Sequence, residues 1–298
     1  MDFRPFRVEL TTRFRGVTER SGVLLHTTGP DGVDHWGEYS PFADYTPRRA
    51  SRWWAAAMEA ARGQWPDPVR DDVPVNAIIP EVPAAQAAEM TAASGCRTAK
   101  VKVGGHGSTL QDAARVEAVA SALGPGGKVR VDANGAWDVD DAVRALTELE
   151  LAVRRGGVEG LEYAEQPCAT VHDLVALRHR VDTPIAADES VRLPGDATAV
   201  IDAGAADIIV LKVAPLGGVR ACLAIAEKAA QAGLSVVVSS ALESSVGLSA
   251  GIALARALPE LPYACGLGTG LLLATDTVTE TLVPVDGILR ARELEVIA

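Results

Sequence analysis

Two lysines stand at alternate positions of a β-branched run, in the segment TAKVKVG at 98–104. On a strand, residues i and i+2 share a face, so Lys100 and Lys102 would point one way and Val101 and Val103 the other. Because lysine is rarely buried, the simplest interpretation is a strand face open to solvent. The alternative is a pair of ammonium groups in a reactive site, and the rest of the chain decides between the two.

Three acidic residues stand at the ends of later runs: Asp132 in VRVD, Glu165 in LEYAE and Asp188 in PIAAD. Three buried carboxylates on neighbouring strands would repel one another unless a cation neutralised them. Oxygen ligands with no cysteine or histidine nearby favour Mg²⁺, with Mn²⁺ as the second choice. These residues therefore predict a metal site. A salt-bridge network between the carboxylates and the lysines is the alternative interpretation.

Lys212 ends a further run, DIIVLK, and adds a third lysine to the set. Lysine has an ordinary pKa of about 10.4, but a neighbouring ammonium, a divalent cation and desolvation each lower the pKa of such a group. The resulting amine could remove a proton from the carbon beside a carboxylate, since a bound cation stabilises the enediolate that forms. A substrate between Lys102 and Lys212 would present one face to each.

Eight apolar runs must position these residues, and they alternate with Ala-rich amphipathic stretches, as in repeated βα units with a parallel sheet. Their starts lie roughly 20 to 30 residues apart, the length of a strand, a helix and two loops. We expect a barrel with its site at the carboxyl ends of the strands. The runs are 75–80, 98–104, 129–135, 160–167, 184–190, 207–214, 234–244 and 263–270.

A Rossmann fold is the other common arrangement of βα units. It requires a Gly-rich fingerprint at the first βα turn. GGHGS at 104–108 has the wrong spacing, and LGTGLLL at 267–273 lies at the last run. The chain before residue 73 follows a different pattern, since FRVEL, GVLLH and HWGEY indicate an antiparallel meander, followed by a helix within 48–65.

Composition limits the function classes. The formal net charge of −11 over 298 residues argues against nucleic acid or an anionic membrane surface as a partner. The four cysteines stand far apart, without a disulfide or zinc pattern. With neither a signal peptide nor a spanning segment indicated, we expect a soluble, cytoplasmic protein with a small-molecule carboxylate substrate. The oligomeric state stays open.

Taken together, the motifs resemble the enolase superfamily, specifically its muconate-lactonizing subgroup, a superfamily known for a Lys or His base and Mg²⁺. The resemblance implies a TIM-like (β/α)7β barrel over 73–270. It also implies an α+β capping domain over 1–72, to which the segment 271–298 returns. The motifs are K-x-K at 100–102, D-x-N at 132–134, E-x-P at 165–167, D-E-S at 188–190 and L-K at 211–212.

Four segments are similar to the actinobacterial-type o-succinylbenzoate synthase family: 11–16, 36–45, 239–247 and 266–273. This implies a Mg²⁺-assisted dehydration of a succinyl-bearing cyclohexadiene carboxylate, a step of menaquinone synthesis. Lys102 would take the α-proton and return it to the departing hydroxyl, Lys212 would stabilise the enediolate, and Lys100 would tune Lys102. The implied metal ligands are Asp132, Glu165 and Asp188.

Substrate contacts are expected from five residues. The helix after the seventh run would present free N–H groups to a distal succinyl carboxylate. The Arg13 and Arg15 loop could close over the site. Gln166 is expected to point away from the metal and to have little effect. The five residues are Arg130, Asn134, Ser239, Ser240 and Arg15.

Three other functions stay open. An N-acylamino acid racemase or dipeptide epimerase would use the same metal and both lysines as bases. A Schiff-base aldolase can use such a barrel, but it needs no carboxylate triad. A non-catalytic binding barrel would not need so many buried charges.

Overall fold

The computed structural model describes residues 1–14 and 16–297. An antiparallel sheet of order β1-β2-β3 opens the chain, with β1 at Asp2–Phe14, β2 at Val17–Thr28 and β3 at Asp34–Tyr39. Helix α1, Pro47–Ala60, packs on β3. It begins where expected, with a Thr46 N-cap and proline in its first turn. The predicted meander and helix are confirmed.

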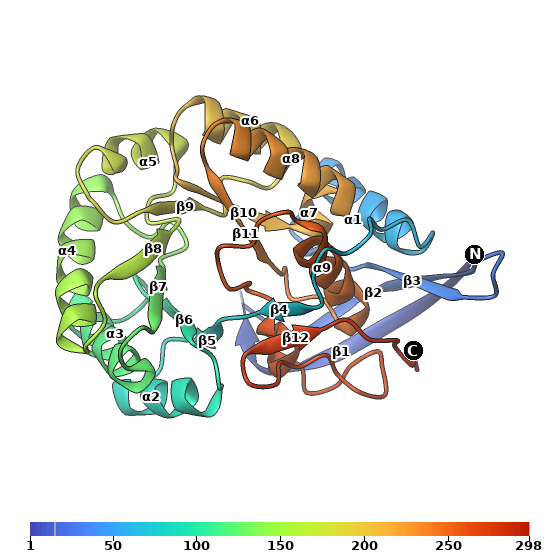
Figure 1. The fold of residues 1–298 in the computed structure, drawn as a ribbon, viewed down its shortest axis with the longest axis horizontal. Coiled ribbons are helices and arrows are strands. Elements are labelled where there is room, and N and C mark those ends of the chain that lie inside the picture. The colour runs from blue at the N-terminus through green and yellow to red at the C-terminus, as the bar shows by residue number, and fades with distance from the viewer. Residues whose placement is uncertain (15, 298) are drawn as a thin grey trace.

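Seven parallel strands form a curled sheet of order β11-β10-β9-β8-β7-β6-β5, with helices around its outside (Figure 1). The strands are β5 (Ala77–Ile79), β6 (Thr98–Lys102), β7 (Lys128–Asp132), β8 (Leu161–Glu165), β9 (Ile185–Ala187), β10 (Ile208–Lys212) and β11 (Ser235–Ser239). The helices are α2 (Ala84–Ala93), α3 (Thr109–Leu123), α4 (Val139–Arg155), α5 (Val171–Arg178), α6 (Pro194–Asp202), α7 (Val213–Leu216), α8 (Val219–Gln231) and α9 (Ser245–Ala257). Among the described helices, none is long and apolar enough to span a membrane.

The eighth predicted strand, 263–270, pairs on both sides but forms no regular strand. Cys265 donates to Pro74 O at 2.7 Å, and Gly266 donates to Val238 O at 2.8 Å, so the segment closes the ring between β11 and the chain before β5. A Cβ at Gly266 would stand 2.6 Å from Ser239 Oγ, so a side chain there would force the Ser239 hydroxyl to move. Glycine disfavours a longer strand, and Gly268–Leu272 turns into a 3₁₀ helix, η1.

Alternate strand residues face the helices and the barrel interior. Ala99 and Val101 are fully buried in the large core beneath the helices. The opposite face of the sheet contributes a smaller apolar cluster inside the barrel, made of Tyr163, Ala186, Ile208, Val210 and Val237. Lys100 and Lys102 share that inner face, so the solvent-facing interpretation of the lysine pair is wrong.

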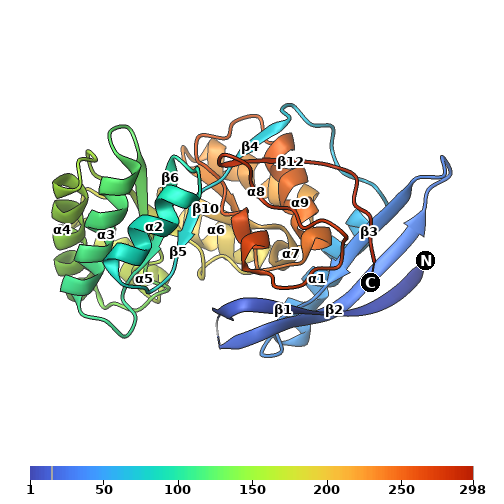
Figure 2. The ribbon, with the colours of Figure 1, turned by 90° about the horizontal axis from the view of Figure 1, so that it is seen from below.

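The last segment of the chain returns to the beginning. Strand β12, Ile288–Arg290, pairs antiparallel with β4, Asp72–Pro74. Ala274 donates to Glu9 O of β1 at 2.8 Å. Figure 2 shows the cap strands and α1 to one side of the barrel, with both termini on that side.

Candidate active site

Charged side chains from five adjacent strands meet at the carboxyl end of the sheet. Lys102 lies beside Asp132 in the β6–β7 register, and Asp132 lies beside Glu165 in the β7–β8 register. Asp188 follows β9, and Lys212 ends β10. The three carboxylate residues are each 2% exposed. The order across the sheet is therefore a lysine, three buried carboxylates and a second lysine.

Every one of these carboxylates is paired with an ammonium group. Lys100 Nζ lies 2.7 Å from Glu165 Oε1 and 3.1 Å from Asp132 Oδ2. Lys102 Nζ lies 2.7 Å from the same Asp132 oxygen, and Lys212 Nζ lies 2.7 Å from Asp188 Oδ2. The salt-bridge network that we considered as an alternative is thus present in this structure.

Burial and charge affect the carboxylates differently. Burial would raise the pKa of Asp132, but Lys100 and Lys102 outweigh it and lower that pKa to about 2. The pKa of Asp188 lies well below its usual value, because Lys212 and Arg192 overcome burial. Burial raises the pKa of Glu165 to about 7, and the charges of Asp132 and Asp188 add to the effect. Burial thus outweighs the attraction of the paired Lys100 ammonium, which lowers the pKa of Glu165 only in part.

The pKa of the Lys100 ammonium is raised by the same carboxylates whose pKa values it lowers. Burial alone would lower its pKa, but Asp132 and Glu165 raise the pKa well above the ordinary value. Lys100 is therefore held protonated between two carboxylates, and a second cation would have to displace it from them.

The three carboxylates fit a divalent metal by their chemistry but not by their present arrangement. Within residues 1–14 and 16–297, no three acidic, histidine or cysteine side chains are grouped so that they could hold an ion as placed, because the carboxylates turn to the lysines. The chemistry nevertheless fits Mg²⁺, since Asp132, Glu165 and Asp188 offer only oxygen donors. A cation would also offset the burial and the neighbouring negative charges that raise the pKa of Glu165. These three residues would hold it once Lys100 turned away.

Gln166 makes more contacts than its position in the sequence indicates. It follows Glu165 with a left-handed φ of 40° and is fully buried. Its Oε1 accepts from the backbone N–H groups of Asp188, at 3.0 Å, and Ser190, at 3.1 Å. Its Nε2 donates to Cys168 O at 2.9 Å and to Ser190 Oγ at 2.8 Å. Gln166 points away from the carboxylates, as expected, but it ties the end of β8 to the end of β9.

Arg192 and Glu189 were missed at the sequence level. Arg192 Nη1 donates to Asp188 Oδ1 at 2.5 Å and to Asp188 O at 2.9 Å. Glu189 Oε1 accepts from Asn134 Nδ2 at 3.0 Å and lies 3.2 Å from Arg192 Nη2. The only signal is the spacing of four residues between Asp188 and Arg192, which carries no meaning outside a helix.

A buried ion pair behind β6 was also missed. Arg115 Nη1 donates to Lys102 O at 2.8 Å and to Asp112 Oδ1 at 2.7 Å. The other oxygen of Asp112 accepts from Gly104 N at 2.8 Å. Since α3 carries both members of the pair, the helix holds the strand end that bears Lys102.

Arg130 lies one step deeper in the barrel than Asp132, and it has no exposed surface. It pairs with Glu162 Oε2 at 2.5 Å, donates to Ala264 O at 2.6 Å, and lies 4.7 Å above the Tyr163 ring. As the structure places it, the Arg130 guanidinium contacts only protein groups inside the barrel, so the expected substrate contact stays a prediction.

The other predicted substrate residues have different surroundings. Asn134 lies at the mouth and accepts a hydrogen bond from Lys102 Nζ. Ser239 is 9% exposed, with its Oγ 3.5 Å from Gly266 O, whereas Ser240 Oγ lies 2.8 Å from Thr269 Oγ1. Asn134 and Ser240 therefore remain candidates. Arg15 lies outside the described residues.

The N-terminus of α9 is already occupied by carboxylates of the protein. Glu38 Oε2 accepts from the backbone N–H groups of Ser244 and Gly247, each at 3.0 Å. Asp276 Oδ1 accepts from Ser245 N at 3.1 Å. The expectation that these N–H groups bind a distal substrate carboxylate is therefore wrong.

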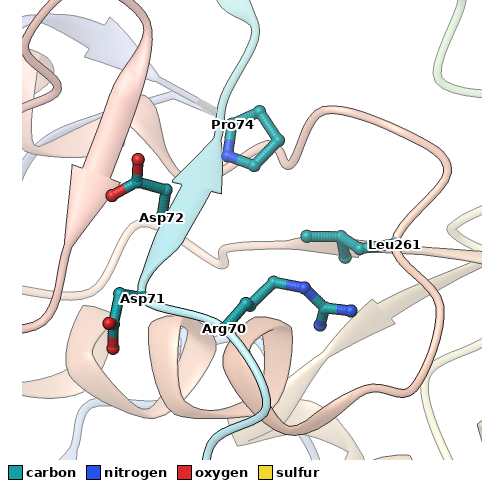
Figure 3. Close-up of a pocket in the computed structure, with 5 residues that line it drawn as sticks. All are labelled: Arg70, Asp71, Asp72, Pro74 and Leu261. Atoms are coloured by element: carbon teal, nitrogen blue, oxygen red, sulfur yellow. The ribbon is translucent and has the colours of Figure 1, made fainter.

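A separate pocket of about 600 Å³ is lined by Arg70, Asp71, Asp72, Pro74 and Leu261 (Figure 3). These residues precede the first and eighth runs of the barrel, so the pocket lies at its amino end, away from the lysines. Its charges have partners: Arg70 donates to three backbone carbonyls, and Asp71 and Asp72 pair with Arg256 and Arg290.

A parallel barrel beside an antiparallel cap, with lysines flanking three carboxylates, defines an enolase-type enzyme. Residues 83–295 match the family model described as Enolase C-terminal domain-like, and residues 6–61 match Enolase N-terminal domain-like. The L-Ala-D/L-Glu epimerase of Bacillus subtilis has a similar fold, with a TM-score of 0.83 at 24% identity over 99% of this chain and 96% of that one.

Curated relatives are more similar in sequence. The o-succinylbenzoate synthase of Thermobifida fusca is 57% identical over 99% of this chain and 89% of its own length. That of Mycobacterium ulcerans is 52% identical over 96% of this chain and 81% of its own length. The chain therefore belongs to the o-succinylbenzoate synthase family of the enolase superfamily. The resemblance found in the sequence and the prediction of an enzyme are confirmed.

Proposed function

We propose that this chain is a Mg²⁺-dependent hydro-lyase that converts 2-succinyl-6-hydroxy-2,4-cyclohexadiene-1-carboxylate to o-succinylbenzoate in menaquinone biosynthesis. One observation carries the proposal: a lysine stands on each side of a row of three buried carboxylates in a chain of this family. A cytoplasmic location accords with the four cysteines, which are all free.

Asp132, Glu165 and Asp188 would hold Mg²⁺, which supplies positive charge beside the substrate carboxylate and makes the neighbouring C–H bond more acidic. Lys102 Nζ, as a free amine, takes the α-proton. The electron pair of that C–H bond passes into the ring, the C–OH bond breaks, and Lys102 returns its proton to the departing hydroxyl as water. The ammonium of Lys212 faces the reacting carbon from the β10 side and stabilises the negative charge that develops.

Surrounding residues position these groups. Arg115 donates to the backbone carbonyl of Lys102, and Asn134 Oδ1 accepts from Lys102 Nζ. Asp188 pairs with Lys212 through one carboxylate oxygen and with Arg192 through the other. Both catalytic lysines therefore have a fixed starting position, which favours proton transfer in one geometry.

The second candidate is an N-acylamino acid racemase or dipeptide epimerase. The observation that favours it is again the position of the lysines, since Lys102 and Lys212 approach the carboxylates from opposite ends of the row. Two such bases could remove and return a proton on opposite faces of one carbon.

Product analysis in ²H₂O tests the two functions. With the succinyl cyclohexadiene acid and Mg²⁺, we expect an aromatic product, and we expect Lys102→Ala to lower kcat by a factor of about 10² to 10⁴. The control is Lys128→Ala, because Lys128 is exposed at the amino end of β7. Solvent deuterium at Cα of both antipodes of an N-acylamino acid, with no dehydration, would establish the racemase instead.

A further inference from the structure

Glu38 of the cap is buried against the barrel, with 4% of its surface exposed. Ser244 donates to its Oε2 through the backbone N–H, at 3.0 Å, and through Oγ, at 2.5 Å. Gly247 N donates to the same oxygen at 3.0 Å, and Ser40 Oγ donates to Oε1 at 2.5 Å. A Cβ at Gly247 would stand 2.8 Å from Glu38 Oε2, so glycine permits this approach.

This contact replaces a local helix cap. Ser244 is the N-cap residue of α9, but its side chain accepts no bond from the helix and instead donates to Glu38. A carboxylate at a helix N-terminus is stabilised by the orphan N–H groups and by the helix dipole. The first turn of a barrel helix is therefore completed by a strand of the other domain.

A second buried charge of the cap holds the same segment. Arg20 of β2 is 4% exposed, and its Nε donates to Leu242 O at 3.2 Å. Leu242 has a left-handed φ of 64°, a conformation that is costly for a branched residue and needs support from its surroundings. Arg20 also donates to Ser40 O, beside Glu38. Two cap residues thus fix the chain between β11 and α9.

That chain segment borders the candidate active site. It begins after Ser239, which lies beside Lys212 in the β10–β11 register. Its first residue, Ser240, lies at the barrel mouth against Thr269. A shift of the loop would therefore move Ser240 without touching the carboxylates of β7, β8 and β9.

We propose that Glu38 is a positioning residue, which caps α9 from the capping domain and so sets the position of the β11–α9 loop and of Ser240 for substrate binding. The expected effect of Glu38 on substrate binding rests on the proposed function. The expected effect of Glu38 on the position of the β11–α9 loop does not. None of the partners of Glu38 is a candidate metal ligand, so Mg²⁺ binding is independent of it.

The first test is amide hydrogen exchange of Glu38→Gln. Glutamine keeps the shape but offers one acceptor oxygen, so an amide N–H group would face the donors of Ser244 or Gly247. We expect exchange at residues 244–247 to accelerate roughly ten- to a hundredfold, because one buried N–H or O–H donor would lose its acceptor. Glu19→Gln, at a partly exposed position of the same domain, is the matched control, with no change expected there. Unchanged exchange at 244–247 in folded Glu38→Gln overturns the proposal.

The second test is kinetic. We expect KM for the succinyl cyclohexadiene acid to rise roughly tenfold in Glu38→Gln, with kcat within a factor of about two and the Mg²⁺-induced rise in Tm unchanged. Ser244→Ala removes the partner of Glu38 on the barrel side. The double variant should raise KM by less than the two single variants would if their effects were independent. An unchanged KM, or a kcat that falls alone, overturns the positioning role. Wild-type chain without dehydratase activity refutes the proposed function only, since amide exchange still tests the capping contact.

Discussion

Gln166, which follows β8, accepts a hydrogen bond from the backbone N–H of Asp188, which follows β9, with 3.0 Å between the two atoms. Two adjacent carboxylate-bearing strand ends are thus joined by a neutral, buried amide. Its oxygen must face two N–H groups, and its nitrogen must face the carbonyl of Cys168, so only an amide satisfies both sides.

We predict that Gln166→Glu destabilises the protein by about 1 to 3 kcal/mol, because a carboxylate oxygen would face the Cys168 carbonyl with no donor between them. Urea unfolding at pH 8 measures this change. We also predict a weaker response of Tm to Mg²⁺, since Asp188 loses its support. Gln231→Glu is the control, because Gln231 is exposed on α8. Equal unfolding free energies for the Gln166 and Gln231 variants would contradict the role of Gln166 as a buried amide that joins the ends of β8 and β9.

The row of charges could be predicted from the sequence. It depends only on the alternation of side chains between the two faces of a strand and on which residues end the strands. Lys100 and Lys102 share a face, and Asp132, Glu165 and Lys212 each end a strand. Parallel strands bring such ends together whatever the exact shape of the barrel.

The sequence pattern did not predict how deep a side chain lies in the barrel, or which distant residue it contacts. Arg130 shares the face of Asp132, but alternation does not tell which layer of a barrel is open to a substrate. The N-terminus of α9 was expected to be free, yet its partner Glu38 lies 206 residues from Ser244 in the chain. No local pattern indicates which distant carboxylate will fill a helix end.

Mg²⁺ binding should compete with Lys100. We predict that Mg²⁺ raises the Tm of the wild-type chain, with about 2.7 kcal/mol of stabilisation at a concentration of a hundred times Kd. Lys100→Met removes the ammonium held by Asp132 and Glu165, so this variant should bind Mg²⁺ more tightly while losing activity. Isothermal titration measures both affinities. Lys128→Met is the exposed control, and weaker Mg²⁺ binding by Lys100→Met would show that no competition exists.

Arg130 should matter for stability and not for substrate affinity. Removing it leaves Glu162 without its partner and the Tyr163 ring without its cation. We predict that Arg130→Met costs about 3 kcal/mol in unfolding free energy, as for other broken buried pairs. Arg144→Met, in an exposed pair on α4, should change it by less than about 0.5 kcal/mol. If the Arg130 variant kept wild-type stability but showed a raised KM, the result would support the prediction that Arg130 contacts the substrate.

The stability of the cap–barrel contact should depend on pH through Glu38. Burial raises its pKa from 4.5 to about 7, with a further contribution from Glu243, and the bonds from Ser244 and Ser40 and the charge of Arg20 offset only part of this. Between those two values the folded chain holds a proton that the unfolded chain has released. The free energy of unfolding must therefore fall as the pH rises through this window.

The stabilisation is complete below the unfolded pKa and is lost above the folded one, a difference of about 3 kcal/mol, since each tenfold change in proton affinity is worth about 1.4 kcal/mol. Urea unfolding at pH 5 and pH 8 measures it by comparison with Glu38→Gln, whose side chain does not titrate. The wild-type chain should lose roughly 2 to 3 kcal/mol more than the variant between these two pH values, because pH 5 already lies slightly above the unfolded pKa. Parallel pH profiles for the two proteins would mean that Glu38 is charged throughout, held so by its five hydrogen-bond contacts with Ser40, Ser244 and Gly247.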